Sequence, residues 1–279
     1  MLDVRITLTF ATALAFAVTP ATTASAADAT PWVQDLHSAF RLIAGSAQKR
    51  AATRRAGIEI KMDPGWHTYW RYAGDSGVPP RFDFSGSENV ASAKVRYPAP
   101  HLFTDETGNT LGYKGSVIFP VEVQTKNPDA PITLKVKLDY AVCEKLCVPA
   151  EGRAEISLTP GKSAEDATLK AAETSVPQPI SASSIGLSVK RVSDAAKPTV
   201  AVDLKLPQHG PAQVFVEGPT PEWALPIPQA VKPRETGREQ FTFELDGLPP
   251  GVDPRKGPFD LTFTIVAGEH AYEVRSRLD

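Results

Sequence analysis

The residues with the clearest capacity for chemistry are the chain's 2 cysteines, Cys143 and Cys147. Such a close pair can form a disulfide, exchange with other thiols, or bind Cu(I) when reduced. Along a continuous strand, residues four apart would lie ~13 Å from each other, whereas a disulfide needs Cα atoms within ~7 Å. A strand pattern leads directly into Cys143, so either the two thiols never pair or residues 144–146 turn the chain back. Because Val148-Pro149 and Gly152 fit a turn that leads into the next strand, we predict a pair held at a bend between two adjacent strands.

The spacing of the pair leaves three interpretations open. The first is a structural bridge, although closing a loop of about five residues adds only ~2 kcal/mol of stability. The second is a redox-active pair, because a tight loop can strain a bridge and make it easier to reduce. The third is a Cu(I) site formed by the same two cysteines, although Met62 is the only thioether beyond the N-terminal segment. We expect no cofactor and no other metal ligand.

Residues 65–71 form a second candidate segment, which is dense in aromatic rings. Trp66, His67, Tyr69 and Trp70 could form a recognition surface for a partner. The alternative, which we favour from the sequence, is a loop whose rings pack over the end of the fold.

Residues 103–108 form a third candidate segment, which is acidic and contains a glycine. It is either an ordinary surface loop or a lid over the cysteines in which a carboxylate assists proton transfer.

Strands are predicted to position these residues, because short runs alternate apolar and polar side chains with a period of two. Residues 132–142 show the pattern well, with Leu134, Val136 and Leu138 separated by polar residues. Further strands are predicted at residues 37–44, 57–62, 81–84, 94–97, 116–124, 154–158, 186–192, 199–206, 212–217, 239–245, 259–266 and 272–276. Together with the 26 prolines, which disfavour long helices, they predict an all-β chain with two β-sandwich domains in tandem.

The ends of the domains follow from changes in composition. Residues 1–26 have the order of a secretory signal peptide: a weakly basic start, a short apolar core and a small-residue exit. The first sandwich is then expected at 27–160, a connector with a short helix near residues 169–172 at 161–180, and the second sandwich at 181–279. Export would place the cysteines where disulfides form and persist.

Charge and hydropathy exclude several kinds of partner. The net charge is −2 and there is no basic run, so nucleic acid is not an expected partner. A bilayer span needs ~20 apolar residues, and no segment after the signal peptide approaches that length. We therefore expect a mature chain without a transmembrane segment.

Several motifs, in their order along the chain, resemble a known family: the N-terminal periplasmic domain of the thiol:disulfide interchange protein DsbD and the related ScsB (suppressor of copper sensitivity) proteins. The resemblance covers roughly residues 35–160. The matching segments are GWHTYWR at 65–71, GDSGVPP at 74–80, YPAP at 97–100, LGYKG at 111–115, FPV at 119–121 and DYAVCEKLCVP at 139–149. The three-residue gap between the cysteines is closer to the ScsB type.

The resemblance implies an immunoglobulin-like sandwich with a redox-active cysteine pair, and we expect both sandwiches to be of that type. It implies a periplasmic module that takes reducing equivalents from a membrane-embedded thiol–disulfide carrier and passes them to periplasmic thioredoxin-like proteins. Cys143 and Cys147 would then be the catalytic pair of a protein-disulfide reductase, and the Val-Pro turn after Cys147 favours that cysteine as the nucleophile. It also implies a cap loop at Phe103, Asp105 and Glu106. The sequence shows no transmembrane electron-transfer segment and no Cys-x-x-Cys motif. Either the electrons then come from another chain, or the pair serves another purpose, such as a structural disulfide in a binding or assembly module.

Overall fold

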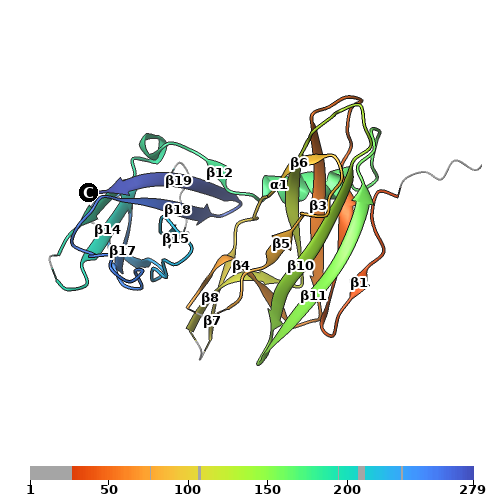
Figure 1. Cartoon of the computed structure of the whole chain (residues 1–279). Helices are drawn as coiled ribbons and strands as arrows, with labels where there is room; N and C mark the ends of the chain where they lie inside the picture. The colour runs from red at the N-terminus through yellow and green to blue at the C-terminus, as the bar shows by residue number, and fades with distance from the viewer. Residues whose placement is uncertain (1–26, 76, 106–107, 194, 207–210, 234) are drawn as a thin grey trace, which may run out of the picture.

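The computed structural model describes residues 27–279 except 76, 106, 107, 194, 207–210 and 234. The predicted signal peptide at 1–26 lies outside the described residues. The described chain is mostly β and forms four sheets, which make two β-sandwich bodies. Figure 1 shows these bodies beside each other, with a helical connector between them in the chain.

The first sandwich contains both cysteines and pairs a five-stranded sheet with a six-stranded sheet. The five-stranded sheet has the order β1 (Val33–Gln34), β2 (Ser38–Ala44), β3 (Thr53–Met62), β9 (Ser116–Thr125) and β6 (Val90–Val95). The six-stranded sheet has the order β11 (Cys147–Ser157), β10 (Thr133–Cys143), β4 (His67–Gly74), β8 (Gly108–Lys114) and β7 (His101–Asp105), with β5 (Arg81–Asp83) beside β10.

Alternation explains why β10 forms where the sequence predicts it. Leu134, Val136 and Leu138 are all buried in the space between the two sheets, whereas the residues between them are partly exposed. Phe40 from β2 and Phe119 from β9 enter the same core from the opposite sheet. Burial of these apolar side chains is the main favourable term that holds the two sheets together.

The second sandwich consists of two four-stranded sheets. One has the order β12 (Gln178–Pro179), β19 (His270–Leu278), β18 (Phe259–Ala267) and β15 (Ala212–Glu217). The other has the order β13 (Ser188–Arg191), β14 (Thr199–Leu204), β17 (Glu239–Glu244) and β16 (Gln229–Val231). The sequence misses β12 and β16, because strands this short leave no alternation to detect.

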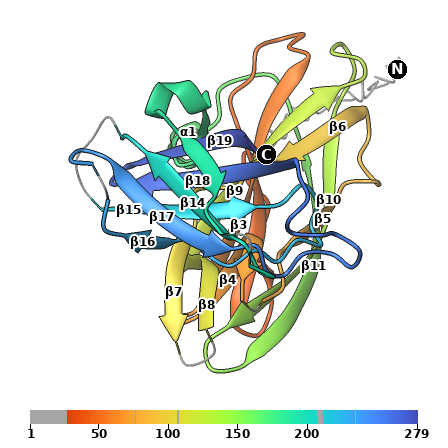
Figure 2. The same ribbon diagram turned by 90° about the vertical axis from the view of Figure 1, so that its left-hand side faces the viewer.

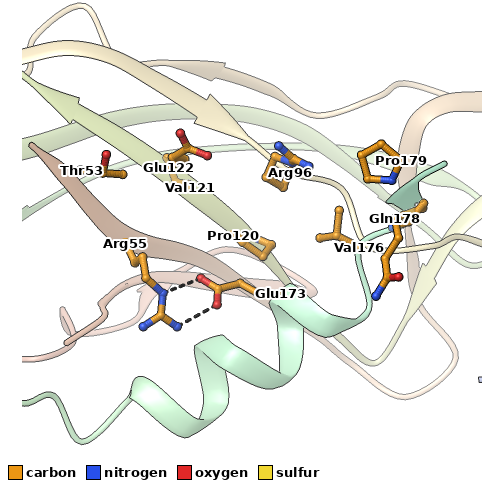
Figure 3. Close-up of a pocket in the computed structure, with 11 residues that line it drawn as sticks. Thr53, Arg55, Arg96, Pro120, Val121, Glu122, Glu173, Val176, Gln178 and Pro179 are labelled. Carbon is orange, nitrogen blue, oxygen red and sulfur yellow. Dashed lines mark hydrogen bonds and ion pairs between the residues drawn. The ribbon is translucent and has the colours of Figure 1, made fainter. Parts of the chain in front are cut away.

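The connector contains the predicted helix, α1 (Asp166–Thr174), which docks on the first sandwich. Leu169 is fully buried there, and the guanidinium of Arg55 on β3 donates to both carboxylate oxygens of Glu173 at 2.8 Å and to Asp166 at 2.7 Å. Figure 3 shows this fork beside a surface pocket lined by β3, β9 and the chain that follows α1. The fork and Leu169 hold the connector helix against the first sandwich.

The aromatic segment at residues 65–71 corrects one prediction. The sequence favours a loop there, but His67 to Trp70 open strand β4 and are buried one after another. The alternation is absent because both faces of this strand are covered, one by the core and the other by neighbouring chain. Consecutive burial is typical of strands covered on both faces, and it hides the period of two on which the prediction depends.

Candidate functional site

The cysteines form a disulfide at the tip of the β10–β11 hairpin. Cys143 is the last residue of β10 and Cys147 is the first of β11, and the two are register partners with Cα atoms 4.1 Å apart. Residues 144–146 make the turn and are exposed. The bend that the strand spacing predicts is therefore present.

The two sulfur-bearing residues differ in their exposure to solvent. Cys143 is buried, with 3% of its surface exposed, whereas Cys147 is exposed. An incoming thiolate must reach a sulfur atom directly, so access to the bridge is easier at Cys147. Leu146, which precedes Cys147 in the turn, is 79% exposed.

The Tyr69 side chain lies against the bridge. Its hydroxyl is 2.7 Å from Sγ of Cys143 and 3.1 Å from Sγ of Cys147. Tyr69 is buried with Ala73, Ala141 and Cys143 in a small apolar cluster on the outer face of the sheet. The site thus has a hydroxyl donor within hydrogen-bonding distance of either sulfur, with apolar surroundings on the side of Cys143.

A glycine allows the chain to pass close over this tyrosine ring. Gly77 has a φ of +133°, and a Cβ atom built on it would lie 2.2 Å from Cε1 of Tyr69. Neither the backbone conformation nor the space admits a side chain at this position. The sequence analysis does not single out Gly77 as a site residue, and its position in the GDSG segment at 74–77 is the signal that could have found it.

His67 and Phe103 continue the site along the sheet. His67 is the register partner of Cys143 across β10 and β4, and its ring centroid lies 5.4 Å from that of Tyr69 and 5.7 Å from that of Phe103. Nζ of Lys114 lies 4.4 Å from the centre of the Phe103 ring, a distance at which a cation–π attraction operates. Lys114 also contributes to the site without having been predicted.

The predicted lid is a β-hairpin and not a loop. Phe103 and Asp105 belong to β7, and Asp105 pairs through its backbone with Gly108 of β8 at the end of the hairpin. Glu106 lies outside the described residues. Figures 1 and 2 show the β7–β8 hairpin and the β10–β11 turn at the same end of the first sandwich.

A second glycine allows the hairpin to lie against β4. Tyr69 pairs with Gly112 of β8, and a Cβ atom at Gly112 would lie 2.0 Å from the carbonyl oxygen of Thr68. This approach of backbone to backbone leaves no room for a side chain. The sequence analysis misses β7 and β8 because their polar residues and glycines do not alternate regularly with apolar ones.

The other two recognition candidates lie apart from the sulfurs. Trp66 is partly buried, and its ring stacks on His37 with 3.9 Å between centroids. Trp70 is fully buried in the core, where it faces Phe215 of the second sandwich. Of the four aromatic candidates, the structure therefore brings only His67 and Tyr69 to the disulfide.

Other possible sites are less informative. Within the described ranges, no group of three or more His, Cys, Asp and Glu side chains could hold a metal ion. No helix among the described residues is long and apolar enough to cross a bilayer. The pocket of Figure 3 is lined by residues of the first sandwich, the connector and β12, and none of them is a residue of the cysteine site.

The fold and the site define a class: a protein of two β-sandwiches with a half-exposed disulfide at a hairpin tip, next to a buried tyrosine. Residues 34–159 match the family described as thiol:disulfide interchange protein DsbD, N-terminal, so this segment of the chain belongs to that family. The resemblance that the sequence motifs indicate is confirmed.

One solved structure supports the two-sandwich fold over nearly the whole chain. It is the crystal structure of the N-terminal periplasmic domain of ScsB from Proteus mirabilis, with a TM-score of 0.72 at 19% identity, covering 90% of this chain and 98% of that one. A protein of unknown function from Porphyromonas gingivalis W83 gives a TM-score of only 0.24 at 11% identity, covering 85% of this chain and 96% of that one, and carries no argument. A search of curated proteins found no match.

Proposed function

We propose that this protein exchanges thiols and disulfides with other proteins through Cys143 and Cys147. The observation that carries the proposal is the contact of the Tyr69 hydroxyl with both sulfur atoms. A purely structural bridge needs no hydroxyl donor within hydrogen-bonding distance of its sulfurs and no exposed member. The membership of residues 34–159 in the DsbD N-terminal family supports the same chemistry.

The exchange begins at the exposed cysteine. A thiolate of a reduced partner attacks Sγ of Cys147, a mixed disulfide forms, and the bond between the two cysteines breaks. Sγ of Cys143 leaves as a thiolate and takes up a proton. The second thiolate of the partner then attacks its own sulfur in the mixed disulfide and releases Cys147, which is also protonated. The partner loses two electrons and two protons, and the cysteine pair gains them.

Tyr69 is placed to assist the departure of the first thiolate. Its hydroxyl lies 2.7 Å from Sγ of Cys143, the atom that becomes negatively charged. A hydrogen bond to a thiolate favours the charged form, which makes it a better leaving group in a buried site. In the reverse direction, the same hydrogen bond favours the Cys143 thiolate that closes the bridge when a substrate is reduced.

The β7–β8 hairpin serves as the cap of the site in this proposal. Phe103 lies beside His67, the register partner of Cys143, and so flanks the site on the side of β8 and β7. Asp105 and Glu106 remain candidates for proton transfer to the leaving thiolate.

The wider role follows the family. The protein would act in the periplasm, accept reducing equivalents from a membrane-embedded carrier and pass them to thioredoxin-like proteins, as a protein-disulfide reductase. The exchange module would occupy residues 27–160, the connector 161–180 and the second module 181–279, with both sandwiches of immunoglobulin-like type.

A redox titration of residues 27–279 tests the proposal. The protein is equilibrated in glutathione buffers of increasing reducing strength, and its free thiols are counted by mass spectrometry. We expect the pair to be half reduced at a potential above about −300 mV, because structural bridges have potentials below that value. A pair that stays oxidised throughout would identify a structural bridge and end the proposal.

Trapping variants test the order of attack. The Cys143→Ser protein keeps the exposed thiol of Cys147. It should form a stable mixed disulfide with a thioredoxin that lacks its buried cysteine and whose exposed cysteine carries a thionitrobenzoate group, which leaves as the free thiolate when Cys147 attacks. The matched Cys147→Ser protein keeps the buried thiol of Cys143 and should form little of this mixed disulfide. Equal trapping by both variants would refute the assignment of Cys147 as the attacked residue.

Addition of Cu(I) to the reduced wild-type protein tests the copper alternative.

A further inference from the structure

Strand β4 carries the residues of the site and then continues into contact with the second sandwich. Tyr69 lies at the sulfurs, and each of the next three residues contacts the other body. Trp70 faces Phe215, with 6.1 Å between ring centroids. Arg71 pairs with two glutamates of the second sandwich, and the Tyr72 hydroxyl donates to the carbonyl oxygen of Leu225.

Arg71 makes a charged contact with the second sandwich. Its Nη2 donates at 2.7 Å to Oε2 of Glu217 and at 2.7 Å to Oε2 of Glu273, and its Nε donates at 2.9 Å to Oε1 of Glu217. The glutamates come from β15 and β19, which lie in the same sheet. Burial disfavours the charge of Arg71, but the hydrogen bonds and charges of Glu217 and Glu273 outweigh it and raise the pKa of Arg71 above its usual value.

The segment that the second sandwich contacts is also where β4 leaves its own sheet partner. Tyr69 pairs with Gly112 and Gly74 pairs with Thr110, so residues 70–73 of β4 lie opposite a single residue of β8. A bulge of this kind bends a strand and is held by whatever packs on it. Here the packing partner of residues 70–72 is the second sandwich.

Both ends of the bulge lead to the cysteine site. At one end is Tyr69, with its hydroxyl at the sulfurs. At the other end is Gly74, where a Cβ atom would lie 2.4 Å from the carbonyl oxygen of Asn109 in the cap hairpin. Asp75 follows and exchanges two hydrogen bonds with the backbone of Asn109, at 2.9 and 2.8 Å. A change in the shape of the bulge would therefore move both the tyrosine and the cap.

We propose that the second sandwich is a positioning module for the cysteine pair and that Arg71 is the positioning residue through which it acts. By holding the bulge of β4, Arg71 fixes the Tyr69 hydroxyl against the sulfurs and fixes the cap hairpin beside them. The inference rests on the proposed exchange function, because it concerns how easily the same pair is reduced.

The direction of the effect follows from the chemistry of Tyr69. A hydroxyl donates a stronger hydrogen bond to a thiolate than to a neutral disulfide sulfur, so a fixed Tyr69 favours the reduced pair. A disulfide whose reduced form is stabilised is easier to reduce. Release of the bulge should then make the pair harder to reduce and slower to react with a thiol.

The test compares Arg71→Ala with the wild-type full chain. In a fixed glutathione buffer we expect the ratio of reduced to oxidised pair to fall about two- to tenfold, as is typical when a coupling residue that touches no ligand is removed. The rate of reduction by dithiothreitol should fall by a similar factor. A ratio and a rate equal to those of the wild type would overturn the inference.

Arg41→Ala is the matched control. Arg41 also pairs with two glutamates, Glu59 and Glu165, and its guanidinium also lies over a tryptophan, Trp32. All its partners lie in the first sandwich or the connector, away from the bulge. A structural role alone predicts that both variants lose stability and neither changes the redox ratio, whereas positioning predicts a change in Arg71→Ala only.

A second pair of substitutions tests the same contact from the other side. The Glu217→Gln/Glu273→Gln protein keeps Arg71 and removes no side-chain volume, so it serves even if Arg71→Ala folds poorly. It should shift the redox ratio in the same direction, and combination with Arg71→Ala should add nothing further. Full additivity would show that the glutamates and Arg71 do not act through one contact. Failure of the exchange function itself is distinct, because then the wild-type pair would not be reduced at all.

Discussion

The two sandwiches differ in the regularity of their strand pairing. In the first, the register shifts twice, between β4 and β8 and between β6 and β9. In the second, every described pairing of strands keeps a continuous register. Both cysteines belong to the irregular sandwich, and the bulge of β4 directly follows the residue that contacts them. Regularly paired strands keep their side chains in a uniform alternation, whereas bulges redirect side chains and are frequent beside active sites.

This comparison assigns different tasks to the two bodies. The first sandwich provides the two sulfurs, the Tyr69 hydroxyl and the cap, and its sheet is interrupted between β4 and β8. The second offers a sheet from which Glu217 and Glu273 pair with Arg71 in the interrupted segment. A departure from local regularity that is stabilised elsewhere is what functional sites commonly show.

The largest expected effect, on the free energy of unfolding, tests whether the two sandwiches share one hydrophobic core or have two separate cores. Phe215 is a residue of the second sandwich, yet it is buried in the core cluster of the first, whereas Phe263 is buried in the core of the second alone. Phe215→Ala and Phe263→Ala should each cost about 3–5 kcal/mol of unfolding free energy, as deletions of buried phenylalanines do. Only Phe215→Ala should also weaken the first sandwich, since it removes the packing partner of Trp70.

Hydrogen exchange measured by mass spectrometry resolves the two cases. In the Phe215→Ala protein, amides of β4 and β8 should lose protection together with those of β15. In the Phe263→Ala protein, the loss should be confined to the second sandwich. Identical patterns in the two variants would mean that the bodies do not share a core, and would weaken the contrast between site and support.

The sequence predicts the regular parts of both bodies well. Alternation of Leu134, Val136 and Leu138 identifies β10, and similar patterns identify most strands of the second sandwich. The bend at Cys143 and Cys147 is predicted from the rise of a strand together with the turn residues that follow Cys147, and the structure confirms it. These features depend on residues close in the sequence, so local pattern is sufficient.

The site is less predictable, because long-range pairing assembles it. His67 reaches Phe103 only through the pairing of β4, β8 and β7, whose residues do not alternate. Arg71 and Glu217 are 146 residues apart, and nothing near either residue indicates the other. The consecutive burial of residues 67–70 hides the period of two that marks a strand, which is why the sequence wrongly predicts a loop there.

A smaller effect tests whether the tyrosine is part of the chemistry or only of the packing. Tyr69→Phe keeps the ring and removes the hydroxyl that contacts both sulfurs. A hydrogen bond to a charged group contributes about 1.5–3 kcal/mol, so reduction of the bridge by dithiothreitol should slow by about tenfold or more. Stopped-flow measurement of the released thiols gives the rate.

Tyr140→Phe is the matched control for that experiment. Tyr140 is also buried, but its hydroxyl is bonded to Oγ of Ser38 at 2.7 Å in the core of the first sandwich. Its loss should lower stability by about 1 kcal/mol without changing the rate of reduction. If both variants react at the wild-type rate, Tyr69 serves only to pack the site. The assignment of the chemistry to the irregular first sandwich, with the regular second sandwich as its support, would then lose its basis.

The smallest effect concerns the contact between the bodies at alkaline pH. Burial, followed by the charges of Asp75 and Glu217, raises the pKa of Tyr72 from 10.0 to about 12. Because the folded pKa lies above the unfolded one, the stabilisation from the neutral phenol is complete below pH about 10 and is lost as the pH rises towards about 12.

Tyr72→Phe cannot ionise, but it lacks the hydrogen bond to Leu225, so it should be less stable by about 1 kcal/mol at neutral pH. Other tyrosines whose pKa is raised, such as the partly buried Tyr97, are the same in both proteins and cancel in the difference. Urea unfolding between pH about 8 and about 11 should therefore show the gap closing as the pH rises. A gap that stays constant would mean that Tyr72 titrates as a solvent-exposed phenol does, and that the contact between the support and the bulge of β4 is more open than the structure indicates.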